Sequence, residues 1–198
     1  IKGISPIDSG LLMLPGALLM GVMSPITGKL FDKYGAKVLA ITGMSIVVIS
    51  TYFFSDLSME TTYLQIMGIY TIRMFGISMV MMPVMTNGLN TLPMTAYPHG
   101  TAMNNTLQQV SGAIGSALLI TIMNTRTTSA AKDLALSGAD PASILKTSML
   151  EGINYTFFIS TFIAAIALLL TLFIKKPSRV VTEVEKDQVY KQQPVTES

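Results

Sequence analysis

Cysteine is absent from the 198 residues, and histidine occurs only once, as His99. Without cysteine the chain has no disulfide, no zinc–thiolate site and no thiol nucleophile. A single histidine argues against a histidine-based metal site. The long apolar segments also contain no paired aspartates, no Ser/His dyad and no HExxH motif. We therefore expect no metal, no resident cofactor and no catalytic residue, and we do not interpret the protein as an enzyme.

Charged residues are also scarce, at 12% of the chain, whereas soluble domains usually carry about 25%. The net charge is only +2, which does not suggest a nucleic-acid partner. The charges are clustered, and residues 9–28, 38–55 and 152–174 contain none. A membrane-spanning helix needs roughly 20 mostly apolar residues. The sequence therefore predicts an all-α integral membrane protein, with the lipid bilayer as its partner.

Five transmembrane helices are predicted within a membrane region that covers residues 1–174. Pro15 and Pro25 fall inside the first helix and Pro83 near the end of the third, where each removes a backbone hydrogen bond. The predicted helices are 9–28, 38–55, 63–86, 101–123 and 152–174.

Two polar segments complete the predicted organisation. Residues 124–151 are expected to form a polar loop, with a helix-start signal at Asp140-Pro141. Residues 175–198 are charged, contain several glutamines and are bounded by prolines, so we expect a disordered tail. The chain begins "IKGISPID", with no initiator methionine and no signal peptide. We expect it to be a fragment that begins in a loop of a longer protein.

Lysine and arginine predict the orientation, because cytoplasmic loops of membrane proteins are enriched in both. Five spans place the 29–37 loop, the 87–100 turn and the tail on one side, with eight basic residues. The other side carries four: Lys2, Arg126, Lys132 and Lys146. The tail is therefore predicted to be cytoplasmic, and the 124–151 loop extracytoplasmic.

A compact charged segment, "GKLFDKYGAK", joins the first two predicted helices. One interpretation is a topology signal whose aspartate caps the next helix. The spacing indicates more, because the segment follows the pattern G-x-L-x-D-K-x-G-x-K. Its glycines permit a tight turn, and its carboxylate could bind a helix N-terminus or a lysine in one conformation and release it in another. The residues of the pattern are Gly28, Leu30, Asp32, Lys33, Gly35 and Lys37.

This pattern resembles motif A of the major facilitator superfamily, with Ala36 at one of the two closing basic positions and Lys37 at the other. "SGLLMLPGALLMGVMSPITGKLFDKYGAK", "RMFGISMVMMPVMTNGLNTLP" and "HGTAMNNTLQQVSGAIGSALL" resemble the fourteen-helix drug:proton antiporters of the EmrB/QacA type. The resemblance covers roughly residues 5–175. It implies the C-terminal part of a plasma-membrane exporter, as found in bacteria, driven by the proton gradient. Missing N-terminal helices of the same protein would complete the fold.

Two residues of the third predicted helix are candidates for lining the transport cavity. Arg73 is the only charge inside a predicted span, and intramembrane charges usually face a cavity or a partner. The alternative is an arginine that extends to the outer interface. Met79 belongs to a methionine cluster whose flexible side chains suit a promiscuous pocket. Most of that cluster is better explained by packing or by contact with lipid.

Polar and small residues mark the fourth predicted helix. Asn104 and Gln108 form one i,i+4 pair and Asn105 and Gln109 another, so they make two adjacent polar rows. They either line the aqueous cavity or form hydrogen bonds between helices. Gly112 and Gly115 are expected to allow close helix packing.

The function predicted from these features is proton-coupled export of lipophilic or cationic small molecules by alternating access. A major facilitator that moves another solute is an alternative. A non-transporting membrane scaffold is a further alternative, against which the motif A pattern argues.

Overall fold

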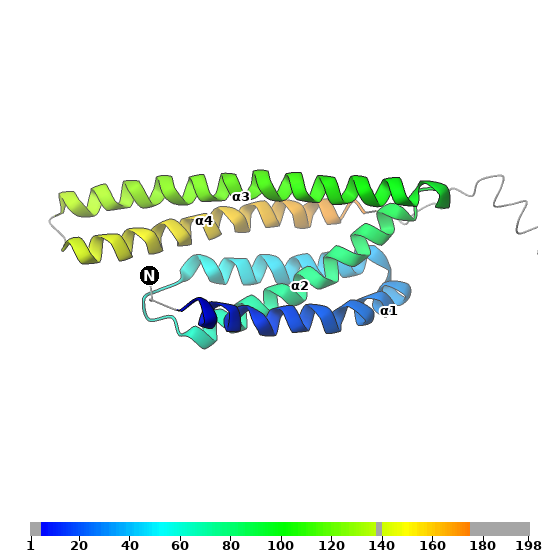
Figure 1. The fold of residues 1–198 in the computed structure, drawn as a ribbon, viewed down its shortest axis with the longest axis horizontal. Helices are drawn as coiled ribbons and strands as arrows, with labels where there is room; N and C mark the ends of the chain where they lie inside the picture. The colour runs from blue at the N-terminus through cyan, green and yellow to red at the C-terminus, as the bar shows by residue number, and fades with distance from the viewer. Residues whose placement is uncertain (1–4, 138–139, 175–198) are drawn as a thin grey trace, which may run out of the picture.

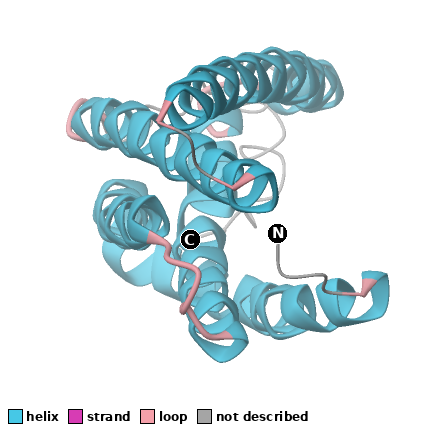
Figure 2. Ribbon diagram, turned by 90° about the vertical axis from the view of Figure 1, so that its left-hand side faces the viewer, coloured by secondary structure: helices cyan, strands magenta, loops and turns pink. Residues whose placement is uncertain are grey.

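The computed structural model describes residues 5–137 and 140–174. The elements are α1 (Pro6–Phe53), η1 (Phe54–Asp56), α2 (Tyr63–Leu89), η2 (Met94–Ala96), α3 (Tyr97–Leu136) and α4 (Pro141–Thr171). No strand occurs in these residues, as Figure 2 shows. The prediction of an all-α membrane fold is confirmed. The tail, residues 175–198, lies outside the described residues, so its predicted disorder stays a prediction.

Helix α1 consists of two arms that meet at Gly35. This glycine has φ 78° and ψ 168°, and it is the one residue in the helix with non-helical backbone angles. The chain folds back there, and α2 crosses and packs against α1 (Figure 1). Helices α3 and α4 form a second pair, and α4 also packs against α1. Only glycine adopts this left-handed backbone without strain.

Four helices of the described residues are long and apolar enough to cross a membrane. The first of these segments, Pro6–Asp56, contains the Gly35 turn, which divides it into two spans. The chain is therefore a multi-pass membrane protein. Helix direction alternates, so that the Gly35 turn, η2 and the end of α4 lie at one end of the molecule (Figure 1). The η1 connection and the α3–α4 connection lie toward the other end.

The prediction of a polar loop over 124–151 is wrong. Helix α3 continues to Leu136 and α4 begins at Pro141, so only a short connection separates them. An apolar run marks only the part of a helix that lies in lipid. Beyond that part, alanine, leucine and lysine still favour a helix in water, so the helix continues. The Asp140-Pro141 start signal is confirmed. The side of the membrane on which this connection lies stays a prediction.

The predicted 29–37 loop is also mostly helical. The first arm of α1 extends past the predicted end at Gly28, and the turn is confined to Gly35. The other helices also differ at their ends from the predicted ranges. The structure ends the third predicted helix at Leu89, begins the fourth at Tyr97 and ends the fifth at Thr171. The third and fourth helices extend beyond the predicted ranges because residues that have left the lipid can still favour a helix. The fifth helix instead ends before its predicted end.

The backbones of the second arm of α1 and of α2 approach closely at Gly43 and Gly76. A Cβ added to Gly43 would lie 2.6 Å from the carbonyl oxygen of Gly76, and one added to Gly76 would lie 2.8 Å from that of Gly43. Any side chain would separate the two backbones. Because lipid provides no hydrophobic driving force between helices, close backbone packing of this kind is a main source of attraction in membranes.

Helix α4 is attached to the α1–α2 connection by a side-chain amide and by two rings. Asn154 Nδ2 donates to the carbonyl of Leu57 at 2.7 Å, and the Leu57 amide donates to Asn154 Oδ1 at 3.3 Å. The rings of Phe54 and Phe157 stack with their centroids 4.9 Å apart. These contacts join the α1–α2 group to the α3–α4 pair.

Candidate functional site

The residues of the motif A pattern surround the turn of α1. Gly28 and Leu30 lie on the first arm, and Lys37 begins the second arm beyond Gly35. A Cβ on Gly28 would meet only Met82 Cε of α2, at 3.7 Å, so this glycine does not mark a tight contact. The left-handed turn therefore depends on the second glycine of the pattern and not on the first.

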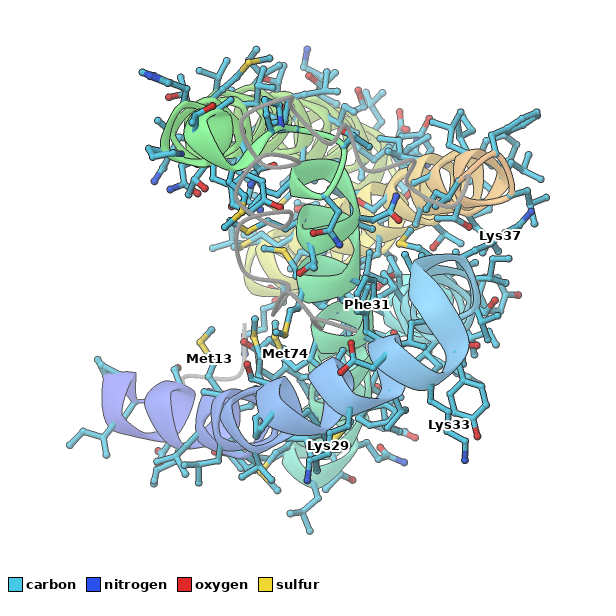
Figure 3. All side chains as sticks on the ribbon, turned by 90° about the vertical axis from the view of Figure 1, so that its right-hand side faces the viewer. Met13, Lys29, Phe31, Lys33, Lys37 and Met74 are labelled. Atoms are coloured by element: carbon cyan, nitrogen blue, oxygen red, sulfur yellow. The ribbon has the colours of Figure 1, made fainter. Side chains whose placement is uncertain are left out.

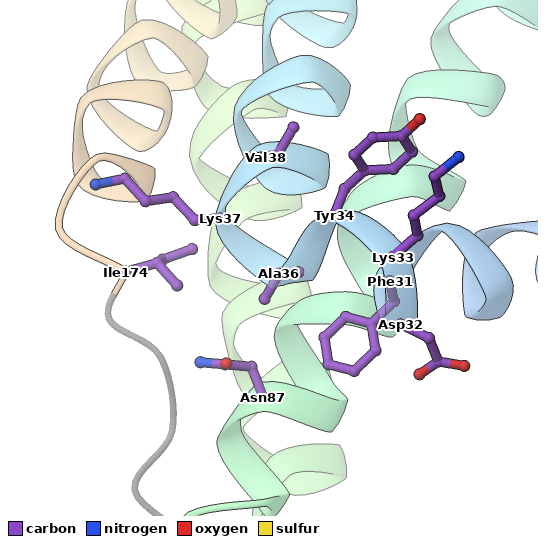
Figure 4. A pocket seen from close by; sticks show the side chains of 10 residues that line it. Phe31, Asp32, Lys33, Tyr34, Ala36, Lys37, Val38, Asn87 and Ile174 are labelled. Atoms are coloured by element: carbon purple, nitrogen blue, oxygen red, sulfur yellow. The ribbon is translucent and has the colours of Figure 1, made fainter.

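A cleft of about 590 Å³ opens beside this turn. It is bounded by α1, by the last turns of α2 and by the end of α4 (Figure 4). Phe31 and Ala36 provide apolar surface, and Lys37 extends on the side of Ile174. The lining residues are Phe31, Asp32, Lys33, Tyr34, Gly35, Ala36, Lys37, Val38, Asn87 and Ile174.

The charged groups of the cleft are exposed. Lys33 Nζ lies 5.3 Å from the centroid of the Tyr34 ring, and Asp32 extends away from Lys37 in Figure 4. Within residues 5–137 and 140–174 Asp32 forms no ion pair. The predicted state-dependent partner of Asp32 is therefore not engaged in this conformation, and its role as a switch stays a prediction.

Arg73 lies well inside α2, ten positions after the helix start at Tyr63. At a rise of 1.5 Å per residue this is about 15 Å along the axis, well away from either end of the helix. The side chain is half-buried, and its Nε is buried without a hydrogen-bond partner in the described part of the chain. A guanidinium in this position requires an anionic or polar partner, which agrees with the interpretation as a cavity residue but does not test it.

Met79 does not line an open space, contrary to the expectation from the sequence. It is only 7% exposed, and its Cβ would lie 3.0 Å from a Cβ added to Gly43. It shares the face of α2 that includes Gly76 and Pro83, both of which are buried. Met79 is three residues after Gly76 and four residues before Pro83, so the helical period places it on the same side of α2, which faces α1. The sequence alone could not show which face packs.

A different methionine face of α2 is less deeply buried than Met79. Met67, Met74 and Met81 recur every seven residues, which places them on one side of the helix. Met74 and Met13, from α1, extend into the same space (Figure 3). Met81 is exposed and accepts a long contact from Gln108 Nε2 of α3, at 3.8 Å. The seven-residue spacing was a signal in the sequence that could have singled out this face.

The polar residues of α3 are placed beside α2 at one edge. Gln108 reaches Met81, and Asn104, one turn earlier, is half-buried. Its Nδ2 has no hydrogen-bond partner in the described residues. Asn105 and Gln109 are exposed. Both interpretations of these rows, as cavity lining or as contacts to another helix, remain predictions.

Gly112 and Gly115 have no neighbour in the described structure. A Cβ added at either position would meet no atom within 4 Å. Close packing at these glycines therefore stays a prediction that requires a helix other than α1, α2 and α4.

An ion pair that the sequence did not suggest joins α3 to α4. Arg126 pairs with Glu151, and the guanidinium lies 5.6 Å from the centroid of the Tyr155 ring. Both charged side chains are about two-fifths exposed, at 41% and 42%. Arg126 and Glu151 both fall in the segment that the sequence predicts as a loop, so the pattern does not show that two helices bring them together. No group of His, Cys, Asp and Glu that could bind a metal occurs in the described residues.

Comparisons with known proteins agree with this geometry. The family model described as Major Facilitator Superfamily matches residues 1–116. The uncharacterized MFS-type transporter YcnB of Bacillus subtilis is 40% identical over 179 residues, which are 90% of this chain and 36% of that protein. The uncharacterized MFS-type transporter YhcA of the same organism is 51% identical over 143 residues, 71% of this chain and 27% of that protein.

A third relative has a name that states a resistance. The lincomycin resistance protein LmrB of Listeria innocua is 46% identical over 169 residues, 85% of this chain and 35% of that protein. The chain thus spans about a third of the length of the curated relatives it matches. No solved structure matches.

Proposed function

The chain belongs to the Major Facilitator Superfamily, and from this premise we propose that it is the C-terminal part of a secondary transporter that exports small molecules. The observation that carries the proposal is the motif A pattern at a turn of α1. The left-handed Gly35 lies where α1, the end of α2 and the end of α4 border one cleft. A turn of this kind, between two membrane spans, suits a joint in a transporter whose halves rock against each other.

We propose further that the substrates are lipophilic or cationic drugs. Three relatives support this class by name: LmrB, a tetracenomycin C resistance and export protein of Streptomyces glaucescens, and a multidrug resistance protein B homolog of Mycobacterium tuberculosis. The latter two are only 22% and 26% identical to this chain, so they weigh less than LmrB. The less buried methionine face of α2, with Met67, Met74 and Met81, would suit bulky apolar molecules, because thioether side chains adapt to different shapes.

The proposed energy source is the proton gradient, without a resident cofactor. The proposed branch is the fourteen-helix drug:proton antiporters, in which helices upstream of this chain would supply the other half of the cavity. We propose a plasma-membrane location in a bacterium, with the tail in the cytoplasm, the bilayer and a small-molecule substrate as partners, and no nucleic acid.

The test is efflux from bacterial cells that lack their own exporters. Cells that produce the full-length protein, including the proposed upstream helices, should accumulate less of a fluorescent lipophilic cation than cells with an empty vector. A protonophore should abolish the difference. If the two strains accumulate equal amounts at verified expression, drug export is excluded, and transport of another solute or a scaffold role becomes the better explanation.

A further inference from the structure

The cleft at the α1 turn combines a cationic rim with apolar walls. Lys33 and Lys37 are exposed, and Phe31 and Val38 line the same space. The last residue that borders it is Ile174, at the end of α4. The polypeptide therefore leaves α4 from the wall of this cleft.

The sequence that follows changes sign along its length. Residues 175–179 carry three positive charges, from Lys175, Lys176 and Arg179. Residues 182–187, "TEVEKD", carry three acids and one lysine, so their net charge is −2. Valine separates the first two acids, so acidic and apolar side chains alternate there, which complements the cationic rim and the apolar walls of the cleft.

We propose that residues 182–187 of the tail dock into this cleft, with their acids beside Lys37 and Lys33 and with Val184 against the apolar wall. Charge selects this segment over the first residues of the tail, because Lys175 and Lys176 would be repelled by the lysines of the rim. Asp32 extends from the cleft on the side away from Lys37 and Ile174 (Figure 4), so an acid beside Lys37 is kept apart from its negative charge.

The distance along the chain permits this docking. Glu183 lies nine positions after Ile174, and an extended segment of that length reaches about 30 Å. Because the segment starts at the cleft wall, closing so short a loop costs little entropy, and the effective concentration of the tail is of millimolar order. Each exposed ion pair contributes little, so the contact is readily reversible.

Docking would connect the end of α4 to both sides of the Gly35 turn. The tail would then restrain the joint and favour the conformation in which the cleft is open. The docking itself depends only on the cleft and on the tail sequence, whereas its effect on transport rests on the proposed function.

The experiment uses two introduced cysteines in the membrane-embedded protein, with any cysteine outside this chain replaced. Val38→Cys and Val184→Cys keep every charge, and the chain has no cysteine of its own. After mild oxidation, mass spectrometry of the digested protein should find the two peptides joined by a disulfide. The control pairs Val184→Cys with Leu136→Cys, which is 88% exposed at the far end of α3. A disulfide yield for the Val38→Cys and Val184→Cys pair that is no higher than the yield for the control pair would overturn the proposal.

A second set of variants tests the charge. Neutral replacement of Glu183, Glu185 and Asp187 by Gln, Gln and Asn should lower the disulfide yield about five-fold, as should high salt. Replacing these acids by lysine while making Lys33→Glu and Lys37→Glu should restore it. A yield that ignores both changes would refute electrostatic docking.

A third arm separates the tail from a lipid headgroup as the occupant. The cysteine pair is oxidised in vesicles of phosphatidylcholine and in vesicles that contain phosphatidylglycerol. Docking of the tail predicts a yield above the control in both. A yield that falls to the control level with phosphatidylglycerol would show that an anionic headgroup occupies the cleft, which contradicts the proposal. Efflux of a lipophilic cation is measured in parallel, so a failure of transport is not mistaken for a failure of docking.

Discussion

Asp32 is a charged residue that lies three positions before the Gly35 turn of α1. It is exposed beside the Gly35 turn and forms no ion pair with any described residue. A carboxylate kept free in one conformation is available to bind a partner in another. Its contribution should therefore be visible in transport more than in stability.

The substitution Asp32→Asn keeps the shape of the side chain and removes its charge. We expect normal insertion and expression, with the efflux rate reduced by more than about five-fold, because an exposed ion pair alone is worth only about 0–1 kcal/mol. The measurement is efflux of a lipophilic cation normalised to protein in the membrane. Unchanged efflux would reduce the motif to a topology signal.

Arg73 is the second residue whose role can be decided by substitution. If its guanidinium faces the cavity, Arg73→Ala should change the substrate range or the efflux rate. Arg73→Lys should restore only part of the activity, because lysine lacks the planar array of donors. Efflux is compared for several cationic and neutral compounds. Equal activity of Arg73→Ala and the parent on all of them would identify an interface anchor.

Among the elements, α2 packs extensively on α1 and also contacts α3. One face packs on α1 through Gly76 and Met79, and another presents Met74 and Met81. Helix α3 differs, because it packs mainly against α4, and Ala130 is the one buried residue within its described range. The row of Asn105 and Gln109 and the glycines Gly112 and Gly115 are therefore free for contacts with a helix outside this bundle or with water.

The crossing of α1 and α2 predicts a stability difference between two glycines of α2. Gly76→Ala should destabilise the protein by about 1–3 kcal/mol, because its Cβ would lie 2.8 Å from the Gly43 carbonyl oxygen and force the helices apart. Gly68→Ala, on the same helix, has no atom within 4 Å of its Cβ and should be neutral or slightly stabilising. Thermal unfolding in detergent compares the two. Similar midpoints would contradict the close crossing.

For the whole molecule, the alternating helices place the Gly35 turn and the end of α4 at one end and the α3–α4 connection toward the other (Figure 1). This arrangement agrees with opposite sides of a membrane for the two ends, as the predicted spans require. The balance of lysine and arginine predicts that the Gly35 end faces the cytoplasm.

Single cysteines test this orientation. Lys132→Cys should react with a membrane-impermeant thiol reagent added outside intact cells, whereas Lys33→Cys and Lys186→Cys should react only after the membrane is permeabilised. The chain has no cysteine to interfere. Strong outside labelling at position 33 or 186, with none at 132, would invert the topology.

Proton coupling by the chain alone is the last prediction. Coupling needs a buried group that titrates and is exposed to each side in turn. Asp32 is exposed, and Glu151 is half-exposed and paired with Arg126. We expect that the 198-residue chain inserts but does not accumulate substrate in liposomes under a pH gradient. Accumulation that a protonophore abolishes would refute this and would weaken the proposal of upstream helices.

Hydropathy and local pattern were enough to predict the helices, the membrane and the motif around Gly35. These depend on the residue and its near neighbours: apolar runs partition into lipid, and a glycine between two charged turns permits a left-handed bend. The same reasoning ended α3 too early, because leaving the lipid does not end a helix.

The side of each helix that packs was decided only by the tertiary structure. Met79 and Met74 have the same chemistry, yet Met79 is buried against Gly43, whereas Met74 is only half-buried and lies beside Gly16 of the first arm of α1. In a soluble helix a polar face marks the exposed side, but a membrane helix is apolar all round. Its packed face is then set by where two backbones can approach, and that depends on residues distant in sequence, such as Gly43 and Gly76.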